Sequence, residues 1–252
     1  MTRVISFSIV KGGSGKTTTA VNLAAYLGMR GHKVLLIDFD PQGNATINLG
    51  VDPDSLTKTV YTSLTGESTV LESILHTKHN IDLLPANDDL SELDLAIIQN
   101  LSKIDRPMHL LKESIVHLDY DYILIDTPPS KGILTVNALV ASTDVIIPMQ
   151  CEYLATKGVN KVIDMIAKTK QNYNSDLNLL GIVATMYNVR TNLSSVVLQE
   201  ARKFFAQKNV TVFDTVINRS IKIAEAPMAG IPAVSYTDYA QSYIELGKEI
   251  FG

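Results

Sequence analysis

The stretch KGGSGKTT, from Lys11 to Thr18, decides how the rest of this chain is interpreted. It lies between the apolar run RVISFSI (residues 3–9), which predicts a strand, and a window from about Thr17 to Met29, which predicts a helix. Glycines in a turn between a strand and a helix let successive backbone N–H groups point inward, and the positive end of the helix adds to their field. The sequence therefore predicts a phosphate-binding loop.

Within this loop, two residue types have an expected task. Lys16 would reach the β- and γ-phosphates of a nucleotide, and the hydroxyl of Thr17 would ligate Mg²⁺. The common form of such a loop, G-x-x-x-x-G-K-[ST], places a glycine at position 10, where this chain has Val10 followed by a second lysine, Lys11. The loop therefore predicts a nucleotide site with an extra cation, whose purpose the loop alone does not explain.

Acidic residues end two further predicted strands. The run KVLLID (residues 33–38) leads into Asp38-Phe39-Asp40, and DYILID (residues 121–126) ends at Asp126. In an open parallel sheet these strand ends lie at the same edge as the first loop. An acid at a strand end is often only a turn residue or a helix cap. Three such features at one edge instead favour a site in which Asp126 holds Mg²⁺ through water.

Strand and helix patterns alternate along the whole chain. Further strands are expected at 80–86, 144–149, 178–185 and 211–217, and further helices near 68–76, 89–101, 107–117, 132–141, 154–172, 194–207 and from about 237. This alternation predicts an α/β fold with a mostly parallel, twisted sheet and helices on both faces. Because the sequence contains no repeat or obvious linker, we expect one domain over residues 1–252.

The composition describes an ordinary globular protein. Of the 252 residues, 46% are hydrophobic and 19% are charged, and Cys151 is the only cysteine. One cysteine cannot form an internal disulfide, and no apolar run is long enough to span a membrane, so we expect a cytoplasmic protein. Between Lys157 and Lys222, ten basic and four acidic residues give a net charge of +6, whereas the remainder carries −10. This asymmetry indicates either a polyanion-binding face or solvated helix surfaces.

Six segments resemble one family along nearly the whole chain. KGGSGKTT, DFDPQGNAT (38–46) and IDTPP (125–129) are similar to the deviant Walker A, A′ and B motifs of the ParA/MinD ATPases. IIPMQCEYLATKG (146–158), TMYNVRTN (185–192) and IKIAEAP (221–227) resemble Soj-type partition proteins. The resemblance implies a P-loop NTPase fold of the SIMIBI type, ATPase activity, and ATP and Mg²⁺ as cofactors.

The resemblance also implies roles for individual residues. Lys16 would bind the nucleotide in cis, Lys11 would reach the nucleotide of a dimer partner in trans, and Asp40 would orient or deprotonate the attacking water. The implied nucleotide-binding residues are Lys11, Gly12, Gly13, Ser14, Gly15, Lys16, Thr17, Thr18, Asp126, Met186, Asn218 and Ser220. The implied metal-binding residues are Thr17, Asp40 and Asp126, and the implied DNA-contacting residues are Arg190 and Lys222.

The chain departs from the family pattern at three places. Ser14 stands where valine is usual, Ile9-Val10 replaces Asn-Gln, and Asn218-Arg219-Ser220 replaces Pro-Arg-Asn. The last segment would lie beside the adenine ring, so the departure concerns contacts to the base.

The partners implied by the resemblance are a second copy of the chain, double-stranded DNA and a ParB-like protein. The ATP-bound dimer would bind DNA without sequence preference and would associate with the nucleoid. Slow hydrolysis, accelerated by the ParB-like protein, would then release the dimer from DNA.

Several alternatives share the same loop. An iron–sulfur carrier ATPase needs at least two cysteines, and a repressor needs an N-terminal helix-turn-helix, for which a strand beginning near Arg3 leaves no room. A membrane-cycling MinD-like ATPase would end in a basic amphipathic helix, whereas the tail YIELGKEIFG has one lysine and two glutamates. Positioning of cargo other than DNA stays open, as does the MinD-like cycle as a weaker alternative.

Overall fold

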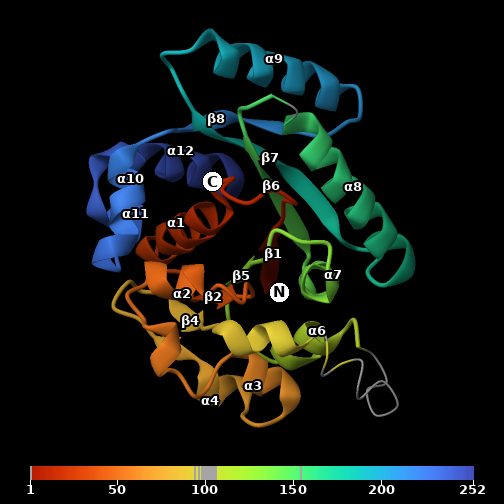
Figure 1. Cartoon of the computed structure of the whole chain (residues 1–252), viewed down its shortest axis with the longest axis vertical. Coiled ribbons are helices and arrows are strands. Elements are labelled where there is room, and N and C mark those ends of the chain that lie inside the picture. The colour runs from red at the N-terminus through yellow and green to blue at the C-terminus, as the bar shows by residue number, and fades with distance from the viewer. Residues whose placement is uncertain (1, 94, 96, 98–106, 154) are drawn as a thin grey trace.

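An eight-stranded sheet forms the centre of the computed structural model, which describes residues 2–93, 95, 97, 107–153 and 155–252 (Figure 1). The strand order is β3-β4-β2-β5-β1-β6-β7-β8. The strands are β1 (Arg3–Phe7), β2 (Val34–Asp38), β3 (Leu75–His76), β4 (Asp82–Leu84), β5 (Tyr122–Asp126), β6 (Asp144–Gln150), β7 (Asn178–Tyr187) and β8 (Val212–Asn218). Apart from the antiparallel pair β3–β4, all neighbouring strands are parallel, which confirms the predicted sheet.

The register of the three central strands sets the geometry of the site. Phe7 of β1 and Asp38 of β2 both pair with Asp126 of β5, so these three strands end at the same level. The loop that follows β1 and the acids that end β2 and β5 therefore meet at one edge, as the sequence predicts.

Helices cover both faces of the sheet (Figure 1). Alternate residues of β2 face opposite ways: Val34 and Leu36 belong to one apolar cluster, and Leu35 and Ile37 belong to the other. The helices on the first face are α1 (Lys16–Met29), α2 (Asn44–Asn48), α10 (Ile221–Glu225), α11 (Ala233–Tyr236) and α12 (Gln241–Phe251). Those on the second face are α3 (Val60–Thr65), α4 (Val70–Ser73), α6 (Leu110–Ile115), α7 (Ile133–Ala141), α8 (Ala155–Asn172) and α9 (Asn192–Ala206).

The region between β2 and β5 differs most from the sequence-based expectation. The helix expected at 68–76 is only the single turn α4, and Leu75–His76 then forms β3 against β4. The helix expected at 107–117 is shorter, at Leu110–Ile115. The helix expected at 89–101 lies partly outside the described residues, and its described start is a 3₁₀ turn at Asp88–Glu92. The short helices α2, α3, α10 and α11 were not predicted, because four to six residues are too few to show a helical period.

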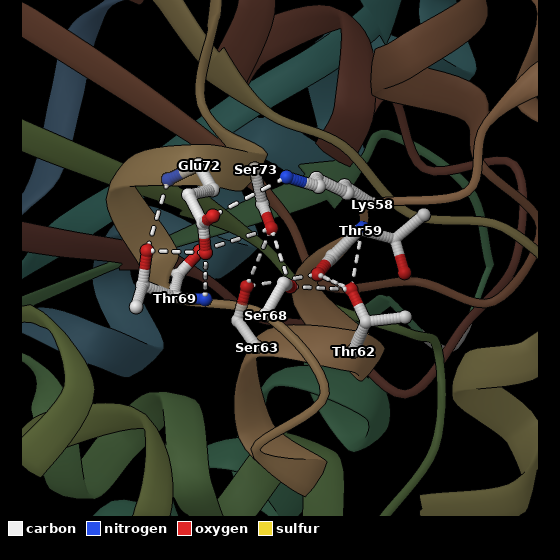
Figure 2. A network of polar contacts seen from close by, with 8 residues as sticks. All are labelled: Lys58, Thr59, Thr62, Ser63, Ser68, Thr69, Glu72 and Ser73. Carbon is white, nitrogen blue, oxygen red and sulfur yellow. Dashed lines mark hydrogen bonds and ion pairs between the residues drawn. The ribbon is translucent and has the colours of Figure 1, made fainter.

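A network of hydroxyl groups joins α3 to α4 (Figure 2). Each of the two helices begins with a capping box, formed by Thr59 with Thr62 and by Thr69 with Glu72. The fully buried Ser73 lies 2.9 Å from the hydroxyls of both Ser63 and Ser68, which ties the two turns together. The capping boxes thus set where each helix begins, and the serine hydroxyls hold the two helices together.

The C-terminal helix α12 is docked on the body of the protein. Its residues Tyr243 and Leu246 are 2% and 0% exposed, and they pack in the same cluster as α1. Gly247 allows close approach, because a Cβ atom there would collide with the ring of Tyr26. Among the described residues, no helix combines the length and the apolar character that a transmembrane segment requires.

Candidate active site

The loop after β1 forms an open cradle of backbone groups. Gly13 and Gly15 have φ angles of 70° and 77°, in the left-handed region that favours glycine. Gly15 is the N-cap of α1, and no described side chain caps this end of the helix. The loop is fixed from below, because the hydroxyl of Thr185 donates to the carbonyl of Ser14 at 2.7 Å. This arrangement suits an anion at the helix N-terminus.

Lys16 is buried between two carboxylates. Its Nζ lies 3.1 Å from Oδ1 of Asp126 and 4.0 Å from Oδ2 of Asp40. The side chains of Lys16 and Asp126 are 7% and 0% exposed, so water screens this pair little. Among the described residues, Lys16 is the cation in ion-pair range of these acids. The site therefore holds more negative than positive charge.

Asp38 is a structural centre of the site that the sequence reasoning noted only as an acid at a strand end. Its Oδ2 accepts hydrogen bonds from both the backbone N–H and the hydroxyl of Thr46, each at 2.8 Å, and its Oδ1 accepts from the N–H of Asp40 at 3.3 Å. Thr46 belongs to α2, so one carboxylate holds both ends of the loop between β2 and α2. Burial, followed by the charge of Asp126, raises the pKa of Asp38 to about 7.

Asp40 lies in the wall of the cradle. Its Oδ1 accepts from the N–H of Gln42 at 3.1 Å, and the residue is 5% exposed. Burial raises the pKa of Asp40, and the hydrogen bond from Gln42 and the charge of Lys16 oppose that rise. A carboxylate with a raised pKa beside a phosphate site is suited to accept a proton from water.

Two adjoining hollows bring most of the predicted nucleotide residues together. The first, of about 510 Å³, is lined by every residue of the loop from Lys11 to Thr18 and by Asp40 and Met186. The second, of about 330 Å³, is lined by Asn218 and Ser220 and shares Met186 with the first. Met186 has a φ angle of 51°, which is uncommon for a residue with a side chain and turns the chain between the two hollows. The geometry thus offers one chamber for phosphates and one for a base.

The donor set at the bottom of the cradle fits Mg²⁺. Oδ2 of the fully buried Asp126 has no hydrogen-bond partner among the described residues, although a buried carboxylate oxygen needs one. A single free carboxylate oxygen beside a phosphate site suits an ion that keeps several waters and takes few protein ligands, as Mg²⁺ does.

The remaining predicted residues are Lys11, Arg190 and Lys222. Lys11 lines the first hollow, but its Nζ pairs with Oε2 of Glu152 at 2.7 Å. Arg190 and Lys222 follow the adjacent parallel strands β7 and β8 and are both exposed. The ammonium of Lys222 pairs with Glu225 at 2.8 Å. The fold therefore places Arg190 and Lys222 on the exposed surface just beyond the ends of two neighbouring strands.

Comparison with known proteins identifies the family. The model of a protein family described as "AAA domain" matches residues 2–179. The chain is 40% identical to the sporulation initiation inhibitor protein Soj of Bacillus subtilis over 99% of this chain and 98% of Soj. The chain belongs to the ParA/Soj family of partition ATPases. It is also 41% identical to the chromosome-partitioning ATPase Soj of Treponema pallidum, over 99% of this chain and 97% of that protein.

A solved structure agrees with the fold. Cobyrinic acid a,c-diamide synthase from Mycobacterium smegmatis, solved with ADP and magnesium, has a TM-score of 0.85 and 35% identity over 98% of this chain and 93% of that chain. The predicted ParA/Soj family membership and P-loop fold are thereby confirmed.

The raised pKa of Asp38 leads to a prediction about pH. Its carboxyl binds a proton more tightly in the folded chain than in the unfolded chain, so the stability that it contributes is lost as pH rises from about 4 towards 7. Asp38→Asn removes this titration. We therefore expect the melting temperature of the variant minus that of wild type, both measured without nucleotide by differential scanning fluorimetry, to be several degrees higher at pH 8 than at pH 5.

Thr46→Val is the matched control, because it removes a hydrogen bond to Asp38 and keeps the carboxyl group. Its melting temperature should fall below that of wild type at both pH values, with no gain at pH 8. An Asp38→Asn variant whose difference from wild type is the same at pH 5 and pH 8 would contradict the assignment.

Proposed function

We propose that residues 1–252 act as one ATPase domain that uses ATP and Mg²⁺ and alternates between a monomer and an ATP-bound sandwich dimer that partitions DNA. The observation that carries this proposal is the buried Lys16 held by Asp126 and Asp40 beneath an open backbone cradle. The surplus of negative charge in that cluster calls for a divalent cation whenever a polyphosphate binds. Thr17 and Asp126, with Asp40 nearby, would hold Mg²⁺, which supplies charge neutralisation of the phosphates.

Each residue of the cradle then has a defined task. Backbone N–H groups of residues 12–18 bind phosphate oxygens, and Lys16 exchanges its contact with Asp126 for a contact with phosphate. Asp40 holds the attacking water and accepts its proton, a role that its raised pKa supports. Met186, Asn218 and Ser220 enclose the base. Phosphoryl transfer needs little more from the protein than this positioning and charge stabilisation.

Lys11 links hydrolysis to dimerisation. Two triphosphates facing each other between two subunits bring strong negative charge into one interface. A lysine from each subunit that reaches the partner's nucleotide offsets this charge and makes close association depend on bound ATP. Lys11 supports this role because it borders the phosphate hollow and, unlike Lys16, has an exposed side chain.

Light scattering coupled to size-exclusion chromatography tests this switch. With ATP and Mg²⁺, Asp40→Ala should accumulate as a dimer, because it binds ATP and loses most of its hydrolysis. Lys11→Ala should stay monomeric in ATP while still binding the nucleotide through Lys16. Wild type should be monomeric without nucleotide and with ADP.

The interpretation fails if Lys11→Ala dimerises as wild type does. It also fails if Asp40→Ala hydrolyses ATP at the wild-type rate. Nucleotide binding by each variant, measured by calorimetry, serves as the control for folding.

DNA is the partner that we infer for the ATP-bound dimer. Arg190 and Lys222 extend beyond adjacent strand ends, within the segment that carries a net charge of +6. Exposed cations bind the phosphate backbone without reading sequence. A dimer presents two such surfaces to one duplex, so ATP-bound protein should bind DNA and the nucleoid far more tightly than the monomer. A ParB-like protein would stimulate hydrolysis and release the dimer.

Arg190→Ala combined with Lys222→Ala should abolish retention of the ATP-bound dimer on DNA and leave its ATPase activity intact. In wild type, the dependence of log affinity on log salt should be steep, and each lost phosphate contact should lower the slope by about one. The control is Lys33→Ala combined with Lys58→Ala, which removes two other exposed cations, each of them in an ion pair. Equal DNA retention by the two double variants would refute the assignment of Arg190 and Lys222.

Two alternative functions are membrane cycling and the positioning of a cargo other than DNA. A membrane-cycling function is disfavoured, because the apolar face of α12 is buried against α1 and is not available to a bilayer. Positioning of a cargo other than DNA shares the ATP switch. If the DNA experiment succeeds, such a protein would also bind the nucleoid, so DNA binding does not separate the two functions. The partner protein that stimulates hydrolysis would then identify the cargo.

A further inference from the structure

Lys11 is held within its own subunit by an acidic residue far along the chain. Its Nζ lies 2.7 Å from Oε2 of Glu152, a residue 141 positions away. The two side chains are 48% and 52% exposed, so the pair lies at the surface and water has access to it. A lysine that is proposed to reach the partner subunit thus forms an ion pair within its own subunit.

Hydrogen bonds constrain the chain around Glu152 on both sides. Its neighbour Cys151 is buried, and the N–H of Cys151 donates to the carbonyl of Thr185 at 3.2 Å. The second oxygen of Glu152 accepts from Nε2 of Gln150 at 2.5 Å. The carbonyl of Glu152 accepts from the N–H of Ala155 at 3.0 Å, at the start of α8. The backbone at Glu152 is therefore anchored and its carboxylate has Gln150 as a further partner, whereas the four-carbon stem of Lys11 supplies the freedom to move.

The pair also decides which side of the loop the lysine faces. Lys11 borders both the phosphate hollow and a third hollow, of about 320 Å³, on the side of Ile9 and Met149. Gln150 and Tyr153, which lie close to Glu152 in the sequence, line this third hollow and do not line the phosphate hollow. The ion pair with Glu152 thus holds the ammonium of Lys11 near the end of β6.

We propose that Glu152 is a positioning residue that holds Lys11 in the monomer and sets the threshold for ATP-dependent dimerisation. The inference rests on the proposed role of Lys11 in trans. A symmetric dimer must open two such pairs, so the two effects multiply. Exposed ion pairs are individually weak, so removal of both should tighten the dimer about 2-fold to 30-fold. The triphosphates outcompete Glu152 because they offer more negative charge than a single carboxylate.

Sedimentation equilibrium with a non-hydrolysable ATP analogue and Mg²⁺ tests the proposal. Glu152→Gln keeps the size of the side chain and removes its charge, so its dimer dissociation constant should be lower than that of wild type by the stated factor. Asp119→Asn is the matched control, since it removes the same charge from an exposed ion pair with Lys33 at 2.6 Å and should leave dimerisation unchanged. An unchanged or weaker dimer for Glu152→Gln would overturn the proposal.

A second readout separates a contact from a general effect of charge. In limited acetylation of the nucleotide-free protein with acetic anhydride, followed by mass spectrometry, Lys11 should react faster in Glu152→Gln than in wild type. Other lysines serve as the internal reference. A tighter dimer with unchanged labelling of Lys11 would mean that the charge acts at a distance, which also overturns the proposal.

Lys11→Ala distinguishes failure of the proposal from failure of the proposed function. If Lys11→Ala dimerises with the analogue, or if wild type does not dimerise, Lys11 has no role in trans and the proposed function falls together with this inference. If dimerisation requires Lys11 and is indifferent to Glu152, only the inference fails.

Discussion

The ion pair between Lys16 and Asp126, buried at the carboxyl edge of a parallel sheet, is the interaction on which the rest of this site depends. Removing two charges from water is costly, and replacing such a pair by apolar residues is often neutral for stability. Its presence here is explained by the exchange that it permits. In the proposed function, Lys16 would transfer from Asp126 to phosphate, and Asp126 would then be free to hold a metal ion. Oδ2 of Asp126, which has no hydrogen-bond partner among the described residues, would be the oxygen offered to that ion.

The sheet enforces this crowding of charge. Because Asp38 pairs in register with Asp126, two carboxylates end neighbouring strands with no residue between them. Each carboxylate is stabilised by a different partner: Asp126 forms an ion pair with Lys16, and Asp38 accepts hydrogen bonds from the N–H and the hydroxyl of Thr46. Through Thr46, whose hydroxyl also accepts from the N–H of Ala86, the charge balance of the site is joined to α2 and to the segment after β4.

The parts of this account that sequence could predict are those fixed by local pattern. The glycine loop between a strand and a helix, and the acids at the ends of residues 33–38 and 121–126, follow from short motifs and from the rule that parallel strands end at one edge. The parts it could not predict depend on contacts between distant residues. The pair of Lys11 with Glu152 and the buried bonds of Asp38 to Thr46 have no local signature. The turn of α4 followed by β3 was mistaken for a helix, because the apolar pattern continues past Ser73, whereas the backbone of Ile74 is already extended and Leu75 pairs with Leu83 of β4.

The central claim is that this site contains one positive charge too few to hold a triphosphate by itself. Calorimetric titration of wild type and Asp126→Asn with ATP, in the presence and absence of Mg²⁺, measures this directly as a coupling between the two ligands. The account predicts that Mg²⁺ tightens ATP binding to wild type by about tenfold or more. It also predicts that Asp126→Asn binds metal-free ATP more tightly than wild type and loses most of the gain from Mg²⁺. An Asp126→Asn variant with the wild-type gain from Mg²⁺ and weaker metal-free binding would contradict it.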